Sequence, residues 1–179
     1  MFTLIDVVDE NNNLTEEVRS YDDVHKYGLF HRTSQVWLIE GENIILQKRS
    51  SKVDFPNLYD VSVGGHIDSG EDSFEAGVRE IFEETGIKIN CDDLGSKFIF
   101  KQMMVFDDFI NNEFNYIYFI FRDNFDLVKN EEVSDFIKVR LVDFKKFYFE
   151  NLDLFFKASE NYYNFIFDIL EKKFNINFI

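Results

Sequence analysis

The sequence predicts an α+β fold in which helices pack on a mixed β-sheet. Short runs rich in Phe, Ile, Tyr and Val predict strands through most of the chain. One helix is predicted in the middle of the chain and another near its end. The chain has one proline and no Ser/Gly-rich linker, so we expect a single domain over residues 1–179.

The first part of the chain is predicted to consist of strands. Residues 3–8 form a β-rich run that ends at a turn cluster of Asp, Glu and Asn. Residues 34–40 and 43–49 are strand-like and are separated by Gly41 and Glu42, which predicts a hairpin. A shorter strand is expected at residues 60–63, ending at a pair of glycines.

A helix should follow these strands. Asp72 and Glu75 form a D-x-x-E capping pattern, and Gly86 is suited to stop the helix.

Strands and a terminal helix are expected in the second half of the chain. Strand runs lie at residues 97–106, 114–121 and 136–141, with a turn at 107–112 between the first two. Residues 159–174 predict a helix with an apolar face, formed by Tyr162, Phe165, Ile166 and Ile169.

The charge and composition exclude several classes of function. The net charge is −15, from 34 acidic and 19 basic residues, which disfavours binding to nucleic acid. Cys91 is the only cysteine, and the N-terminus has no signal-peptide pattern, so we expect a cytoplasmic protein. No run approaches the roughly 18 apolar residues of a membrane span. The oligomeric state stays open, with a homodimer as one option.

The middle helix carries a cluster of carboxylates. On a helical wheel, Glu80, Glu83 and Glu84 share an arc about 100° wide. Like charges at this spacing repel, and Mg²⁺ removes that repulsion because it takes oxygen ligands. A solvated acidic face is the alternative explanation of the cluster. An apolar arc lies roughly opposite and consists of Phe74, Val78, Ile81, Phe82 and Thr85.

The cluster belongs to a longer motif. Residues 65–87 read GHIDSGEDSFEAGVREIFEETGI and match G-x₅-E-x₇-R-E-U-x-E-E-x-G-U, where U is aliphatic. A chance match is on the order of 10⁻⁸ to 10⁻⁹ per window. This is a complete Nudix box, so the chain resembles the Nudix family. The resemblance implies the Nudix fold, a mixed β-sheet sandwiched between helices (α/β/α), and Mg²⁺-dependent cleavage of a diphosphate, with Mn²⁺ as an alternative cation.

The resemblance also assigns roles within the box. Glu83 and Glu84 match the principal metal ligands, and the carbonyl of Gly65 matches a backbone ligand. Glu80 matches a position that binds metal or orients the attacking water. The remaining motif positions are expected to be structural: Glu71, Arg79 and Gly86.

A second resemblance covers about residues 2–144. The segment from His25 to His66 is similar to the isopentenyl diphosphate isomerase branch of the same superfamily. In that branch three histidines and a later acidic pair bind a metal, which implies a metal pocket at His25, His31, His66 and Glu113. Residues 111–113 read Asn-Asn-Glu, so one acid of the pair is lost.

One departure argues against isomerisation. Gly64 stands where the isomerases carry a catalytic cysteine, and the box that those enzymes have degraded is complete here. Nearby cations are candidates to hold substrate phosphates, although each is also explained as a surface cation: Arg32, Lys48, Arg49 and Lys52.

The sequence therefore predicts hydrolysis, by metal-activated water, of a diphosphate linkage in a nucleoside diphosphate derivative or a similar small organic diphosphate. Glu80 and Glu113 are both candidates for the base, with Glu80 ahead. The alternatives are an isopentenyl diphosphate isomerase and a non-catalytic ligand-binding module. The group linked to the diphosphate, X, is not specified by the box. Candidate segments for contacting X are residues 31–36, 103–108 and 147–163.

Overall fold

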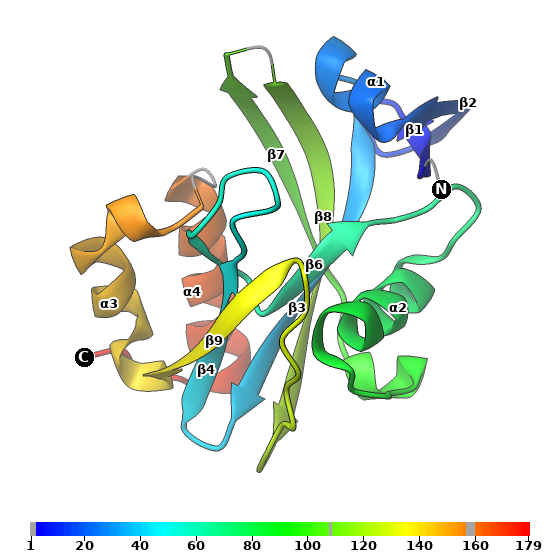
Figure 1. Cartoon of the computed structure of the whole chain (residues 1–179). Helices are drawn as coiled ribbons and strands as arrows, with labels where there is room; N and C mark the ends of the chain where they lie inside the picture. Colours follow the sequence, from blue (N-terminus) through cyan, green and yellow to red (C-terminus); the bar gives the residue numbers. More distant parts are fainter. Residues whose placement is uncertain (1–2, 108, 157–159) are drawn as a thin grey trace.

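A mixed β-sheet forms the centre of the molecule (Figure 1). The computed structural model describes residues 3–107, 109–156 and 160–179. Within them the main sheet runs in the order β5-β4-β3-β8-β7, with β6 paired to β3 and β9 paired to β4. Its strands are β3 (His31–Glu40), β4 (Asn43–Arg49), β5 (Tyr59–Asp60), β6 (Val63–His66), β7 (Phe98–Phe106), β8 (Phe109–Arg122) and β9 (Val133–Arg140).

The parallel pair β3 and β8 lies in the middle of this sheet. Their register runs from His31 opposite Glu113 to Glu40 opposite Arg122. Residues 36–39 of β3 and 116–121 of β8 form continuous apolar runs because helices cover both faces of the sheet there, as is usual for parallel strands. At the end that begins with His31, the same strands carry polar residues.

Helices cover both faces of the sheet. On one face α2 (Ser73–Thr85) packs over a core that includes Val36, Leu38 and Tyr118. On the other face α3 (Phe144–Glu150) and α4 (Glu160–Phe174) pack over Trp37 and Ile117. Figure 1 shows the sheet between these two layers. The predicted α+β class and α/β/α arrangement are confirmed.

An N-terminal unit lies against one end of the sheet. It contains the hairpin of β1 (Leu4–Val8) and β2 (Leu14–Ser20), followed by α1 (Tyr21–Tyr27). A small core of Ile5, Val7 and Val24 holds it together. β1 was predicted, whereas β2 and α1 were not.

Two predictions about local structure are wrong. The strand expected at residues 60–63 is divided into β5 and β6, with residues 61–62 between them. The turn expected at 107–112 is shorter, because β8 already begins at Phe109.

The predicted helices agree more closely with the structure. α2 begins after Asp72 with both hydrogen bonds of the capping box and ends at Gly86, which has a φ of 76°. Phe82, expected on the buried face, is 50% exposed, whereas Glu80 and Glu84 are buried. Ser159, the expected start of α4, and Asp108 lie outside the described residues.

The part of the chain that the structure describes also contains three short 3₁₀ turns: η1 (Cys91–Leu94), η2 (Leu141–Asp143) and η3 (Leu152–Leu154). Among the described residues, every helix is too short or too polar to cross a membrane.

Candidate active site

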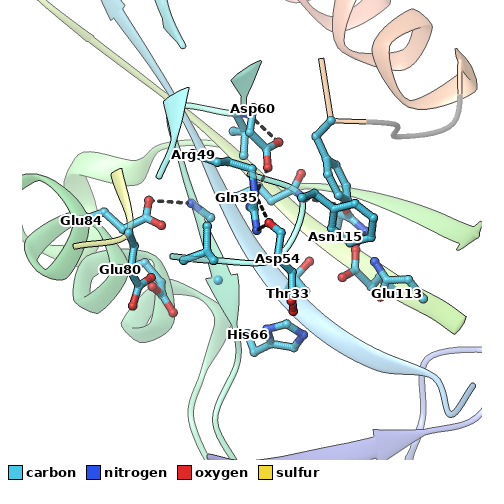
Figure 2. Close-up of a pocket in the computed structure, with 18 of the residues that line it drawn as sticks. Thr33, Gln35, Arg49, Asp54, Asp60, His66, Glu80, Glu84, Glu113 and Asn115 are labelled. Carbon is cyan, nitrogen blue, oxygen red and sulfur yellow. Dashed lines mark hydrogen bonds and ion pairs between the residues drawn. The ribbon is translucent and has the colours of Figure 1, made fainter. Parts of the chain in front are cut away.

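A cavity of about 630 Å³ opens at the polar end of β3 and β8. Figure 2 shows Glu80 and Glu84 on one side of it and Glu113 and Asn115 on the other. It brings together most of the predicted site residues: Gly65, His25, His66, Glu80, Glu83, Glu84, Arg79, Glu113, Arg49 and Lys52.

Arg79 connects the box to the rest of the site. It donates hydrogen bonds to both carboxylate oxygens of Glu71, at 2.9 and 2.8 Å, and to the backbone carbonyl of His66 at 2.9 Å. Its Nη1 also contacts Glu80 at 2.6 Å and Glu83 at 3.1 Å. The hydrogen bonds to Glu71 raise the pKa of Arg79, so its charge is permanent. Arg79 thus holds the loop, strand β6 and two carboxylates in one arrangement.

The three clustered carboxylates differ in burial. Glu80 is 9% exposed and Glu84 6% exposed, whereas the side chain of Glu83 is 56% exposed. Glu84 accepts a hydrogen bond from the backbone N–H of Gly64 at 3.2 Å. Burial raises the pKa of Glu80 to about 7 and raises that of Glu84 well above its usual value. Two adjacent buried carboxylates of this kind fit a bound cation, which would favour their ionised form.

Position 65 requires glycine because the backbone there lies very close to the Glu80 carboxylate. A Cβ atom on Gly65 would lie 2.0 Å from Glu80 Oε1. The absent side chain lets the backbone of β6 approach the carboxylate.

A second group of candidate metal ligands lies in the same region. His25 on α1, His31 on β3, His66 on β6 and Glu113 on β8 each offer a ligand atom, and all four atoms lie within 4.8 Å of one another. These residues are far apart in the sequence, and the packing of α1 against β8 brings them together. Asn112 contributes to that packing by donating to the carbonyl of Gly28 at 2.7 Å.

Backbone carbonyls orient two of the histidines through Nδ1. Nδ1 of His25 lies 2.8 Å from the carbonyl of Tyr21, and Nδ1 of His31 lies 3.0 Å from that of Leu29. Because a carbonyl only accepts, these Nδ1 atoms each carry a proton, and Nε2 is the ring atom that remains to face a metal. Among the described residues, Nε2 of His31 and Nε2 of His66 are buried without a hydrogen-bond partner.

The charges of this group also suit a cation. Burial lowers the pKa of His66 to about 3, so its imidazole is neutral. Burial raises the pKa of Glu113, but the neighbouring His31, whose Nε2 lies 3.8 Å away, and His66 outweigh this effect and lower the pKa to about 2. A carboxylate with a lowered pKa beside three histidines is a suitable ligand set for a divalent metal.

Two of the four predicted phosphate-binding cations line the cavity, and two do not. Arg32 binds the side chain and carbonyl of Asn12, at 2.7 and 2.6 Å, and lies outside the cavity lining. Lys48 also lies outside it. Arg49 and Lys52 line the cavity.

Arg49 and Lys52 already have protein partners. Arg49 forms an ion pair with Asp60 at 3.1 Å and donates to the carbonyl of Asp54. Lys52 pairs with Glu131 at 3.1 Å, and both side chains are largely exposed. Lys52 is therefore the freer of the two to contact a ligand.

Thr33 and Gln35 line the cavity from the candidate segment 31–36. Further polar residues on the strands beneath the cavity were not predicted from the sequence: Gln47, Gln102, Asn111 and Asn115. A signal was present in the sequence, because each of the two strands β3 and β8 has a run of consecutive polar residues, 31–35 and 111–113, before its apolar part.

The chain matches known proteins over most of its length. The family model described as NUDIX domain matches residues 29–166. Nudix hydrolase 3 of Arabidopsis thaliana is 32% identical over 96% of this chain. A prenyl-diphosphate phosphatase of Methanosarcina mazei is 40% identical over 48% of this chain. The chain spans 24% and 51% of the lengths of these two relatives.

A solved structure shares the fold. The bifunctional NMN adenylyltransferase/ADP ribose pyrophosphatase of Francisella tularensis, complexed with AMP and a Mn ion, superposes with a TM-score of 0.60 at 18% sequence identity. The match covers 79% of this chain and 41% of that one. At this identity the similarity concerns the fold alone.

Proposed function

The chain belongs to the NUDIX family, and from this membership we propose that it hydrolyses a diphosphate linkage in a nucleoside diphosphate derivative or a similar small organic diphosphate. Mg²⁺ is the proposed cation, with Mn²⁺ as an alternative. One observation carries the proposal: buried Glu80 and Glu84 line a single cavity together with Glu83. Buried carboxylates this close are costly unless they are protonated or bind a cation.

In the proposed mechanism Glu83, Glu84 and the carbonyl of Gly65 hold the cation. When bound, a divalent cation neutralises the charge that gathers on the diphosphate and acidifies water. Glu80 is the proposed acceptor of the proton of the attacking water, because its carboxylate lines the cavity beside Glu83 and Glu84. Glu113, the other candidate base, lies among His25, His31 and His66, where it is better placed to bind a metal than to accept a proton. Arg79 positions Glu80 through their 2.6 Å contact.

We also propose that His25, His31, His66 and Glu113 bind a divalent metal. The unpartnered Nε2 atoms of His31 and His66 support this, as does the carboxylate held ionised beside them. Asn111 takes the position of the lost acid. Its Oδ1 is buried without a partner among the described residues, so it is suited as a neutral further ligand.

The proposed active unit includes the whole chain, residues 1–179. Thr3 and Tyr21 line the cavity from the N-terminal unit, and Tyr162 lines it from α4. The histidine cluster likewise depends on His25 in α1, which precedes the region matched by the family model.

Two alternatives make different predictions. An isopentenyl diphosphate isomerase would interconvert isopentenyl and dimethylallyl diphosphates, although Gly64 offers no thiol at the position of the isomerase cysteine. A non-catalytic module would bind a diphosphate with Mg²⁺ and release no phosphate. NMR of the two isomers tests the first alternative.

The proposed hydrolysis is tested by a substrate panel. The panel holds nucleoside di- and triphosphates, dinucleoside polyphosphates, nucleotide sugars and isopentenyl diphosphate, each with and without Mg²⁺. We expect Mg²⁺-dependent release of phosphate or nucleotide, and we expect Glu83→Gln and Glu84→Gln to lower kcat at least about 100-fold, or roughly 2.7 kcal/mol.

The matched control is Glu150→Gln, which changes an exposed glutamate at the end of α3. Full turnover in both box variants would refute the metal assignment.

A further inference from the structure

The sheet face that points toward α4 changes from apolar to polar beneath the cavity. On β3, Trp37 and Ile39 belong to the core under α4, and the next residues on the same side are Gln35 and Thr33. The same change occurs on β8, where Ile117 is followed by Asn115 and Glu113, and on β7, where Phe100 is followed by Gln102. Figure 2 shows Thr33, Gln35, Asn115 and Glu113 gathered at this floor.

A chain of hydrogen bonds fixes part of this polar floor. The hydroxyl of Tyr162 donates to Oε1 of Gln35 at 2.5 Å, and Nε2 of Gln35 donates to Oδ1 of Asn115 at 2.6 Å. Nδ2 of Asn115 then donates to Glu113 at 3.2 Å. Each amide has two donors and an acceptor oxygen with two lone pairs, so these bonds orient the amides without using all of their capacity.

Two further floor residues have unused acceptors. Oγ1 of Thr33 and Oε1 of Gln102 have no hydrogen-bond partner among the described residues, although the side chains are only 4% and 3% exposed. Leaving a buried polar atom unpaired costs roughly 1–3 kcal/mol, so such atoms usually have a ligand or water to bind. Both residues line the cavity.

We propose that this floor, made of Thr33, Gln35, Gln102 and Asn115, is a subsite for a neutral, hydroxyl-bearing X group, that is, a sugar moiety attached to the diphosphate. The inference rests on the proposed function, since it names the class of X in that reaction. Hydroxyl groups both donate to the unpartnered acceptors and accept from the amide N–H groups.

A hydrocarbon X does not suit this floor. A prenyl chain would bury the amides and the Thr33 hydroxyl without replacing their hydrogen bonds to water, and the loss would reduce affinity. The M. mazei relative is named as a prenyl-diphosphate phosphatase, but it matches only 48% of this chain. A direct comparison between a hydroxylated and a hydrocarbon X therefore decides the question.

The test compares two ligands with the same number of carbons, ribose 5-diphosphate and isopentenyl diphosphate. Binding of their non-hydrolysable methylene-bridged analogues is measured by calorimetry on the full chain with Mg²⁺. We expect the ribose analogue to bind at least about tenfold more tightly. Equal or tighter binding of the isopentenyl analogue, or no binding of the ribose analogue, overturns the inference.

Two near-isosteric variants separate ligand binding from folding. Thr33→Val and Gln102→Met remove the unpartnered atoms, so the melting temperature should stay unchanged or rise. Each should weaken ribose binding about 3- to 10-fold and leave isopentenyl binding unchanged or tighter, because the apolar side chain removes a buried polar atom. Thr15→Val is the control, because the Thr15 hydroxyl is already bonded to the carbonyl of Val7.

Equal weakening of both ligands would show that the two residues act on the diphosphate or on the metals instead. Mn²⁺ affinity, measured on the same variants, should not change. Hydrolysis assays keep the two proposals apart. Turnover of isopentenyl diphosphate alone would refute the subsite and keep the hydrolase, whereas selective ribose binding without turnover would keep the subsite and refute the hydrolase.

Discussion

At the scale of single residues, Glu84 shows how a binding site reduces stability. It is buried next to Glu80, and burial raises the pKa of both carboxyl groups. Without metal the folded state therefore holds protons that the unfolded chain releases above a pKa of about 4.3. The free energy of unfolding should then fall as the pH rises through the raised pKa values.

We predict that Glu84→Gln stabilises the metal-free protein at about pH 8 by roughly 1–3 kcal/mol, and by less at about pH 5. Urea unfolding of both proteins at the two pH values, with EDTA present, measures this difference. The lowered pKa of His66 acts in the opposite direction at lower pH, but it is common to both proteins and cancels in the comparison. A variant equally or less stable than the parent at pH 8 contradicts the prediction.

Prediction from sequence was uneven at this scale. The Nudix box is set by spacing along one loop and helix, so the motif was recognised from the sequence, and its expected structural residues Arg79 and Glu71 form an ion pair in the structure. The polar floor depends on the register between β3, β8 and β7, which no local pattern specifies. Asn111 and Asn112 looked like turn residues because Asn is common in turns, yet they occupy a strand.

At the scale of elements, helix α1 completes the histidine cluster because it carries His25. It was missed because it has seven residues, and Val24 is its one fully buried apolar side chain. β2 was missed because its residues are mostly exposed and do not alternate. Helix α2, by contrast, has both caps and an extended periodic pattern, so its bounds were predicted closely.

The position of α1 depends on Gly28, which ends it. Gly28 has a φ of 62°, and a Cβ there would lie 2.7 Å from Cγ2 of Ile110 on β8. We predict that Gly28→Ala costs about 1–2 kcal/mol of stability. It should also weaken Mn²⁺ binding at the histidine cluster at least about threefold, because His25 shifts with the helix.

Gly41→Ala is the matched control, since Gly41 has a similar φ of 55° but nothing within 4 Å of the added Cβ. It should lose stability through backbone strain alone and keep its metal affinity. Manganese titration followed by electron paramagnetic resonance, together with thermal melts, measures both quantities. Equal loss of Mn²⁺ affinity in the two variants would show that α1 does not position the cluster.

At the scale of the whole molecule, the acidic charge and the acidic cavity have related consequences. A net charge of −15 destabilises the compact state by self-repulsion, and any salt reduces that effect. The carboxylates of the cavity add a separate effect, because a cation that binds only the folded state stabilises it by mass action, by about 2.7 kcal/mol at 100 times its Kd. Screening depends on ionic strength alone, whereas stabilisation by binding depends on which cation is present.

We therefore predict that MgCl₂ raises the melting temperature by several degrees more than NaCl of equal ionic strength. Screening explains only the NaCl part. The excess should disappear in the double variant Glu83→Gln/Glu84→Gln, whose charge is two units less negative, and should persist in Glu150→Gln/Glu10→Gln, which changes the charge equally at exposed positions. If both double variants lose the excess alike, Mg²⁺ acts through the overall charge, and the carboxylates on α2 form an acidic face that holds no specific ion.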